Sequence, residues 1–333
     1  MPARAEETRP SRALPMLTDM LGNSLNDRLL FAVPKKGRLH QPCIDLLAGS
    51  DIQFHRHSRL DIALVKNFPL ALVFLPAADI PTFVGEGRVD LGITGRDQVA
   101  EHDAATPPTD KTGVEEVMDL GFGKCKLQVQ VPEKGPITKP EELVGKNIVS
   151  SFVNLSEKYF ADLESKHGTP TTNGDAPTKT TIKYVGGSVE AACALGVADG
   201  IVDLVESGET MRVAGLKAIS TVVESTAVLI KSKHPSDPKL IELIASRIRG
   251  VITAQKFVLC TYNIERSKLD VASKITPGKR APTVNPLEEE GWVAVSVMVE
   301  SKIIADTMDQ LEQIGAEDIL VTRLENSRTR LVV

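Results

Sequence analysis

One stretch organises this chain: ADGIVDLVESGETM, residues 198–211. Its first half is an apolar run that predicts a buried strand, and its second half predicts a loop of small residues. Because side chains alternate along a strand, Asp199 and Asp203 point to the same side. Ser207, Gly208 and Thr210 then offer hydroxyls and approachable N–H groups, which a phosphate needs. This order suits a ribose 5-phosphate, although a strand ending in Ser-Gly-x-Thr also makes an ordinary tight turn.

The composition is that of a globular protein with two or three domains. The chain has 333 residues, more than one ordinary domain holds. Aromatic residues make up only 4%, which argues against surfaces that stack nucleic-acid bases. The net charge of -5 leaves any phosphate ligand to local cations, N–H groups or a metal. No apolar run approaches the roughly 20 residues of a membrane span. We therefore expect no nucleic-acid partner and no membrane contact.

The four cysteines are scattered and show no CxxC spacing, which is typical of reduced thiols in a cytoplasmic protein. Residues 1–26 are polar and lack the apolar core of a secretory signal. We expect them to form an N-terminal extension.

A basic loop follows the first predicted strand. RLLFAV, residues 28–33, predicts a buried strand, and residues 39–48 have helical spacing. Between them, Lys36, Gly37 and Arg38 are candidate ligands of phosphate groups. A solvated basic turn is the alternative.

A second stretch repeats the pattern of the first. GRVDLGITG, residues 87–95, is a Gly-x-x-Asp turn, a buried strand, and a hydroxyl followed by glycine. Two such strand ends predict two α/β lobes that face one cleft, although Gly-x-x-Asp is also a common helix-to-strand connection. Asp90, Thr94 and, at the end of another predicted strand, Ser151 are the candidate cleft residues. Between these landmarks, residues 101–113 predict a surface loop, and Thr138 with Glu141 predicts a capping box.

The last part of the chain has a different pattern. Residues 257–324 predict strand, helix, two strands, helix and strand, which is the ferredoxin-like βαββαβ unit. No pairing of a nucleophile with a base is visible there. Small domains of this kind bind regulatory ligands, and oligomerisation is the plain alternative.

Taken together, these motifs resemble the long form of the ATP phosphoribosyltransferase family. The match spans roughly residues 29–321, and residues 198–210 are its most specific part. The segments that carry it are KKGRL at 35–39, DIP at 79–81, VDLGITG at 89–95, GSVE at 187–190, ADGIVDLVESGET at 198–210 and GAEDILV at 315–321.

The resemblance implies an α/β fold with two lobes of the type II periplasmic-binding-protein kind and a ferredoxin-like regulatory domain. The expected boundaries are 1–26 for the extension, 27–117 and 217–252 for lobe I, 118–216 for lobe II and 253–333 for the regulatory domain. It implies the first reaction of histidine biosynthesis: N1 of the adenine of ATP attacks C1′ of 5-phosphoribosyl pyrophosphate (PRPP), and pyrophosphate leaves. It also implies Mg²⁺, inhibition by L-histidine bound within residues 253–333, and a homo-oligomer, either dimer or hexamer.

The chemistry of this displacement assigns roles to the candidate residues. Positive charge builds up on the sugar and negative charge on the leaving group, so carboxylates, cations and Mg²⁺ are needed. Asp199 and Asp203 would bind the ribose directly or through the metal, and Ser207, Gly208, Glu209 and Thr210 would hold the 5-phosphate. Lys36, Gly37, Arg38, Asp90, Thr94 and Ser151 would face ATP. Glu190 would orient ATP or accept a proton, but a carboxylate at a helix N-terminus is as often a cap.

Two other classes of protein compete with this interpretation. A two-lobed module that binds a small molecule without catalysis would share the lobes. A pyrophosphorylase or kinase-like nucleotide enzyme is the other, but the sequence has no phosphate-binding loop of the form GxxxxGK[ST].

Overall fold

The computed structural model describes residues 25, 27–57, 60–167 and 179–328. The expected N-terminal extension lies outside these residues apart from residue 25. The chain divides into two compact units. One comprises the described residues up to Cys43 together with Phe54–Asp237, and the other comprises Ile44–Gln53 with the chain from Pro238 onward. Among the described residues, no helix has both the length and the apolar character needed to cross a bilayer.

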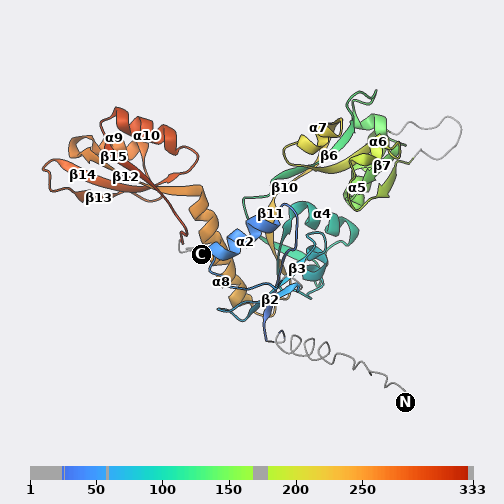
Figure 1. The fold of residues 1–333 in the computed structure, drawn as a ribbon, viewed down its shortest axis with the longest axis horizontal. Coiled ribbons are helices and arrows are strands. Elements are labelled where there is room, and N and C mark those ends of the chain that lie inside the picture. Colours follow the sequence, from blue (N-terminus) through green and yellow to red (C-terminus); the bar gives the residue numbers. More distant parts are fainter. Residues whose placement is uncertain (1–24, 26, 58–59, 168–178, 329–333) are drawn as a thin grey trace, which may run out of the picture. The chain divides into compact units, whose positions relative to one another are not determined.

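The first lobe is built on a six-stranded sheet in the order β2-β3-β1-β4-β11-β5. Figure 1 labels β2, β3 and β11 of this sheet. Strands β1, β3 and β4 are parallel, whereas β2 and β11 run antiparallel to their neighbours. Continuous apolar runs make the central strands, because both faces of a parallel sheet are covered. The strands are β1 Leu29–Pro34, β2 Ile62–Leu64, β3 Leu70–Leu75, β4 Leu91–Gly95, β5 Val114–Asp119 and β11 Ala227–Ser232. The helices in this stretch are α2 His40–Gly49, α3 Ile80–Gly85 and α4 Arg96–Ala105.

The second lobe has a five-stranded sheet in the order β10-β6-β9-β7-β8. Strands β7, β8 and β9 are parallel, and β6 and β10 are antiparallel to their neighbours. One core cluster includes Phe160 of α5, and another joins α6 and α7 to β9. The strands are β6 Cys125–Pro132, β7 Asn147–Ser150, β8 Thr181–Tyr184, β9 Gly200–Val205 and β10 Leu216–Ser225. The helices are α5 Val153–His167, α6 Ala191–Ala194 and α7 Glu209–Val213.

The two lobes repeat one topology. The order β3-β1-β4-β11-β5 in the first sheet corresponds to β8-β7-β9-β6-β10 in the second. The chain crosses between the lobes twice, from β5 to β6 and from β10 to β11. The two crossings are hydrogen-bonded side by side, since the Ala227 amide donates to Phe122 O at 3.0 Å and the Leu120 amide donates to Ala227 O at 2.9 Å. Strands β4 and β9 occupy equivalent positions, so the internal repeat predicted from the sequence is confirmed.

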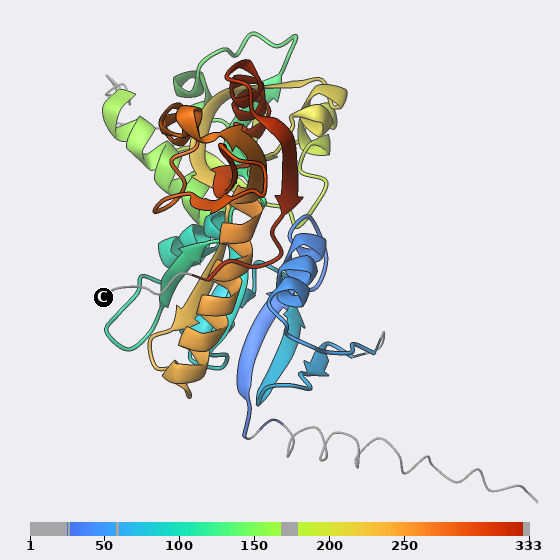
Figure 2. The ribbon, with the colours of Figure 1, turned by 90° about the vertical axis from the view of Figure 1, so that its left-hand side faces the viewer.

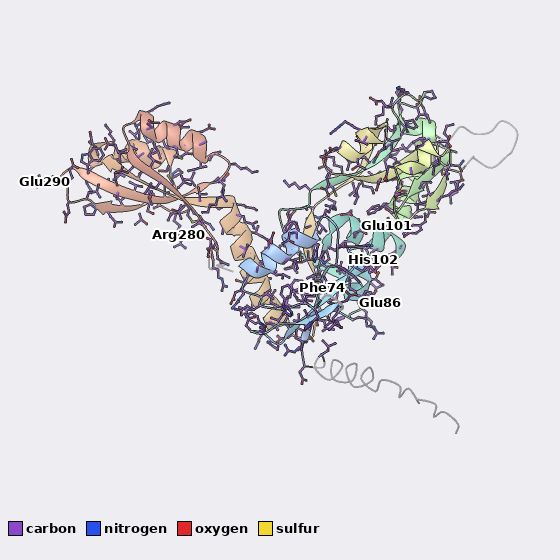
Figure 3. All side chains as sticks on the ribbon, in the orientation of Figure 1. Phe74, Glu86, Glu101, His102, Arg280 and Glu290 are labelled. Atoms are coloured by element: carbon purple, nitrogen blue, oxygen red, sulfur yellow. The ribbon has the colours of Figure 1, made fainter. Side chains whose placement is uncertain are left out.

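A carboxylate of the first lobe caps a helix of the second. Glu101 of α4 is labelled in Figure 3. Its carboxylate accepts hydrogen bonds from the Asn154 backbone amide at 2.8 Å, the Asn154 side-chain amide at 2.8 Å and the Leu155 backbone amide at 2.9 Å. These amides belong to the first turn of α5, where N–H groups have no partner within the helix. Glu101 therefore ties the lobes together at a second place besides the crossings.

The other unit begins its C-terminal part with α8 Pro238–Lys256, one continuous helix (Figure 2). An apolar stripe at helical spacing faces inward along it, as expected for an amphipathic helix. Gly49 packs against α8, because a Cβ atom there would lie 3.2 Å from Val251 Cγ1. Arg247 of α8 also pairs with Asp51 at 3.2 Å.

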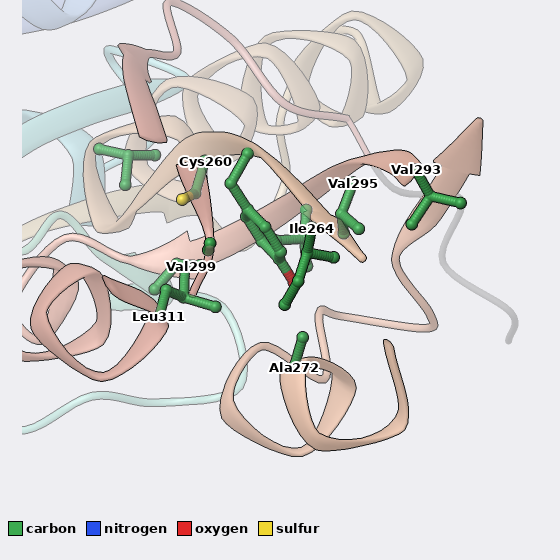
Figure 4. Close-up of a cluster of buried hydrophobic side chains, with 11 residues drawn as sticks. Cys260, Ile264, Ala272, Val293, Val295, Val299 and Leu311 are labelled. Carbon is green, nitrogen blue, oxygen red and sulfur yellow. The ribbon is translucent and has the colours of Figure 1, made fainter. Parts of the chain in front are cut away.

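The rest of this unit is a four-stranded antiparallel sheet in the order β13-β14-β12-β15. Alternation in β12 and β14 buries every second residue, and these residues form one core with α9 and α10, part of which Figure 4 shows. The elements are β12 Phe257–Glu265, α9 Leu269–Ile275, β13 Thr283–Pro286, β14 Trp292–Glu300, α10 Ile304–Gln313 and β15 Glu317–Arg323. The order of elements and the strand order confirm the ferredoxin-like βαββαβ prediction.

Three local predictions are wrong. The loop predicted at residues 101–113 begins inside α4, which extends to Ala105. The predicted capping box is shifted by one residue: Glu142, not Glu141, accepts hydrogen bonds from the Thr138 and Lys139 amides, at 2.7 and 3.2 Å, and a 3-10 turn starts at Pro140. Strand pairing also places β10 in the second sheet, although the sequence grouped residues from 217 with the first lobe.

Candidate functional site

A cavity of about 350 Å³ lies where β9 ends and α7 begins. The carboxyl ends of parallel strands are where open α/β sheets bind ligands. The second lobe contributes most of its lining: ten residues come from β9, the loop after it, α7 and the turn before α6, and Gln130 comes from β6. The first lobe contributes Arg38. The lining residues are Arg38, Gln130, Glu190, Asp203, Leu204, Val205, Glu206, Ser207, Gly208, Glu209, Thr210 and Met211.

Asp203 is the carboxylate that β9 itself brings to this cavity. One of its oxygens accepts a 2.8 Å hydrogen bond from the Leu204 amide. Burial raises the pKa of Asp203 above that of an ordinary aspartate, the Leu204 hydrogen bond opposes the increase, and the negative charge of Glu190 adds to it. The strand is fixed here by Gln130, whose buried side-chain amide donates to Asp203 O at 3.3 Å.

The loop after β9 turns sharply at Gly208. Its φ of 75° is left-handed, a conformation that glycine adopts without the strain of a side chain. The turn starts α7, so the first N–H groups of that helix have no partner within it. The Ser207 hydroxyl accepts from the Glu209 amide at 3.3 Å. Hydroxyls of Ser207 and Thr210 and these N–H groups can together hold an anion.

Glu190 stands at the N-cap position of α6 but makes no side-chain capping bond. Its carboxylate therefore does not serve the helix and remains part of the cavity wall. The sequence left open whether Glu190 is a cap or a site residue, and the structure shows no side-chain cap.

Arg38 is the one cation among the described residues that line this cavity. Its guanidinium donates to Gly123 O, lies 3.5 Å from Asp97 Oδ1 and lies 3.3 Å from Glu206 Oε1. Asp97 is completely buried and also accepts a hydrogen bond from the Ser225 hydroxyl. The first lobe and the crossing segment therefore hold Arg38 in place.

Three of the predicted site residues are used elsewhere in the structure. The Asp199 carboxylate accepts from the Asn147 amide at 3.0 Å, before β9 starts. Asp90 accepts from the Leu30 amide at 2.9 Å and from the Ser236 amide at 2.6 Å, before β4 starts. Thr94 is fully buried and donates to Ala77 O at 2.7 Å. None of the three is among the residues that line the cavity.

Three further candidates lie outside the cavity lining. Lys36 and Gly37 are exposed in the loop after β1, and the φ of Gly37, 83°, is left-handed. Ser151 is half-buried at the end of β7, next to Ser150, whose hydroxyl donates to Val202 O at 2.7 Å.

Sequence reasoning missed Glu206 and Asp97, the two carboxylates that face Arg38. Glu206 lies inside the stretch 198–211, and Asp97 comes two residues after Gly95, the last glycine of the repeated motif, so both stand beside motifs that the sequence shows. It also missed a neighbouring cavity of about 370 Å³. That cavity lies at the crossings and has charged walls, lined by Arg96, Asp119, Lys124, Cys125, Lys126, Val205, Glu206, Glu224, Ser225 and Thr226.

Two segments of this chain match models of known protein families. A family model described as ATP phosphoribosyltransferase matches residues 76–250, and one described as HisG, C-terminal domain, matches residues 254–326. Among solved structures, a chain of the ATP phosphoribosyl transferase (HisG:HisZ) complex from Thermotoga maritima aligns with a TM-score of 0.53 at 22% identity. The alignment covers 66% of this chain and 96% of that one, and it shows likeness of fold. The expected fold class, two lobes of the type II periplasmic-binding-protein kind and a ferredoxin-like domain, is confirmed.

Similarity to curated proteins extends over most of the chain. The ATP phosphoribosyltransferase of Yarrowia lipolytica is 64% identical over 308 residues, which is 92% of this chain and 99% of that protein. The enzyme of the same name from Saccharomyces cerevisiae is 57% identical over 309 residues, with the same coverage. Together with the two-lobed fold and the strand-end cavity, these matches show that the chain belongs to the ATP phosphoribosyltransferase family.

Proposed function

We propose that this chain transfers the phosphoribosyl group of PRPP to N1 of the adenine of ATP and releases pyrophosphate, the first step of L-histidine biosynthesis. One observation carries the proposal: in a chain of this family, Asp203, the Ser207–Thr210 loop and Arg38 line one cavity. The cavity offers a carboxylate for a sugar, an anion-binding turn for a phosphate and a guanidinium for a further phosphate.

Each lining residue then has a chemical task. Asp203 accepts hydrogen bonds from the ribose hydroxyls and stabilises the positive charge that develops at C1′. The loop at Ser207–Thr210 holds the 5-phosphate through hydroxyls and N–H groups. Glu190 helps to orient ATP at the edge of the cavity. No protein nucleophile is needed, because the adenine nitrogen attacks C1′ itself, so positioning supplies most of the rate enhancement.

The charge of the cavity wall supports a role for Mg²⁺. Four carboxylates line the cavity, on Glu190, Asp203, Glu206 and Glu209, against the single guanidinium of Arg38. A polyanion such as PRPP therefore meets a negative wall unless a cation accompanies it. Mg²⁺ prefers oxygen ligands and is usually held by one or two carboxylates together with substrate phosphates and water.

Asp203 and Glu190 are the carboxylates that would hold this ion, because burial and mutual repulsion favour a cation between them. Among the described residues no group of three potential ligands exists, so substrate oxygens and water would complete the set. When bound, Mg²⁺ would neutralise charge on the departing pyrophosphate. Asp199, the other expected ligand, is engaged at the far end of β9.

The ferredoxin-like domain gives the proposal a regulatory part. Residues 254–326 match the C-terminal domain of the family, and a small βαββαβ module suits an effector site. We propose that L-histidine binds there and inhibits turnover, that the chain acts in the cytoplasm, and that it assembles into dimers or hexamers.

One assay tests the reaction. Purified protein is mixed with ATP, PRPP and Mg²⁺, and absorbance in the near ultraviolet is followed together with the release of pyrophosphate. A new chromophore formed in step with pyrophosphate is the expected result. Ligand binding by folded protein without either product would instead identify a two-lobed binding module and overturn the proposed reaction.

A further inference from the structure

We propose that Glu206 is an internal competitor for the phosphate groups that Arg38 binds. In the ligand-free protein its carboxylate occupies the guanidinium, and a phosphorylated substrate displaces it. This inference rests on the proposed function, because it assumes that a phosphate enters the cavity at Arg38.

The surroundings of Arg38 distinguish fixed partners from an exchangeable one. Each guanidinium nitrogen faces a different acceptor: Gly123 O, Asp97 or Glu206. The Asp97 side chain is 0% exposed and Gly123 O belongs to the crossing segment, so these two acceptors anchor the guanidinium. The Glu206 side chain is 51% exposed and lines the cavity. A ligand can therefore replace Glu206 while Arg38 stays anchored.

Charge explains why the exchange proceeds. A half-exposed ion pair contributes little free energy, because water and salt screen it. A phosphate brings more negative charge than a carboxylate and forms a forked, charge-assisted contact with a guanidinium. Its binding also moves the Glu206 carboxylate out into solvent, away from Glu209 and Asp203 on the same wall.

Glu206 therefore weakens substrate binding by a small, fixed factor. In exchange, it occupies Nε of Arg38, the one guanidinium among the described lining residues, when no substrate is bound. Glutamine at this position keeps the shape of the side chain but removes the competing charge, so phosphate groups should bind more tightly.

Steady-state kinetics of Glu206→Gln in the full-length chain test this, with ATP and PRPP varied in turn to show which of them supplies the phosphate. The KM for at least one substrate is expected to fall about twofold to fivefold, the change that loss of a half-exposed ion pair produces, while kcat stays nearly the same. Unchanged or raised KM values for both substrates would overturn the inference.

Glu224→Gln is the matched control. It removes an exposed carboxylate that pairs with Lys126 at 2.7 Å beside the neighbouring cavity and does not touch Arg38. Its KM values should equal those of the unaltered protein. An equal fall in both variants would show that total charge, and not competition at Arg38, governs affinity, which would overturn the inference.

A binding experiment separates this inference from the proposed function. If the unaltered protein makes no product, the proposed reaction fails, and calorimetric titration with inorganic pyrophosphate still tests Glu206. Binding that is about twofold to fivefold tighter in Glu206→Gln supports internal competition. Equal or weaker binding overturns it.

Discussion

Gly123 lies so close to Leu39 that a Cβ atom at position 123 would stand 2.3 Å from Leu39 Cδ2. The glycine also has a left-handed φ of 65°, and its carbonyl oxygen accepts from Arg38. It belongs to the first crossing between the lobes. The close approach therefore links the crossing to the one guanidinium in the cavity lining.

Gly123→Ala is expected to destabilise the protein by about 2 to 4 kcal/mol, the combined cost of overpacking and of a left-handed alanine. Gly121 is the matched control, since its φ is also left-handed, 79°, but nothing lies within 4 Å of its Cβ position. Gly121→Ala should cost only the backbone strain, about 1 to 2 kcal/mol. Urea denaturation measures both variants, and equal losses would show that the contact with Leu39 does not limit this position.

Asp203→Asn is expected to lower kcat about a hundredfold to a thousandfold, because an amide does not stabilise positive charge on the ribose as a carboxylate does. Asp199→Asn should cause a much smaller loss, since the Asp199 carboxylate serves the Asn147 amide outside the cavity. Turnover of both variants, with circular dichroism to verify folding, makes the comparison. Near-normal turnover by Asp203→Asn would remove the ribose role.

Asp203→Asn should also change how the stability of the protein depends on pH. Burial raises the pKa of Asp203, so the folded protein releases this proton at a higher pH than the unfolded chain does. Below both pKa values the carboxyl is neutral in both states and costs nothing. As pH rises from roughly 4, the unfolded aspartate ionises first, and the native protein loses stability until Asp203 ionises too. The Tm of Asp203→Asn should therefore exceed that of the unaltered protein at pH 8, and the difference should shrink toward pH 4. A difference that does not change with pH would contradict the assigned cause.

Removal of Phe257–Val333 tests the regulatory proposal. The deletion takes away the whole ferredoxin-like sheet with its own core and leaves α8 in place. Turnover by the truncated chain should no longer respond to L-histidine, because the proposed effector site is gone. The assay compares initial rates with and without L-histidine in the full and truncated chains. Inhibition that persists in an active truncation would place the effector site in the catalytic lobes.

Local sequence pattern predicted the elements with strong periodicity. The apolar runs of β1 and β9 predicted buried strands, and the order of elements in residues 257–324 predicted the ferredoxin-like domain. β10 was missed because this long edge-side strand, LKAISTVVES, is mostly half-buried and has no continuous apolar run. The position of β10 in the sheet is set by its pairing with β6, more than 80 residues earlier in the chain, and a local sequence pattern does not predict such a distant pairing.

The site was predictable where its residues are neighbours in the sequence. Asp203 and the Ser207–Thr210 loop follow one another, so the alternation and the small residues predicted them together. Asp199 lies on the same side of the strand as Asp203. However, four residues along a strand span about 13 Å, a distance too long for both carboxylates to bind the same ligand group. The pairing of Arg38 with Glu206 joins the two lobes, and only the folded chain brings these residues together.

The central claim is that PRPP binds where β9 ends, and a crystal structure of the full chain with PRPP and Mn²⁺ tests it most directly, because anomalous scattering locates the ion. The account predicts the 5-phosphate against the Ser207–Thr210 loop, the ribose hydroxyls at Asp203 and the metal beside Asp203 and Glu190. PRPP bound instead in the neighbouring cavity, between Arg96 and Lys126, would contradict it.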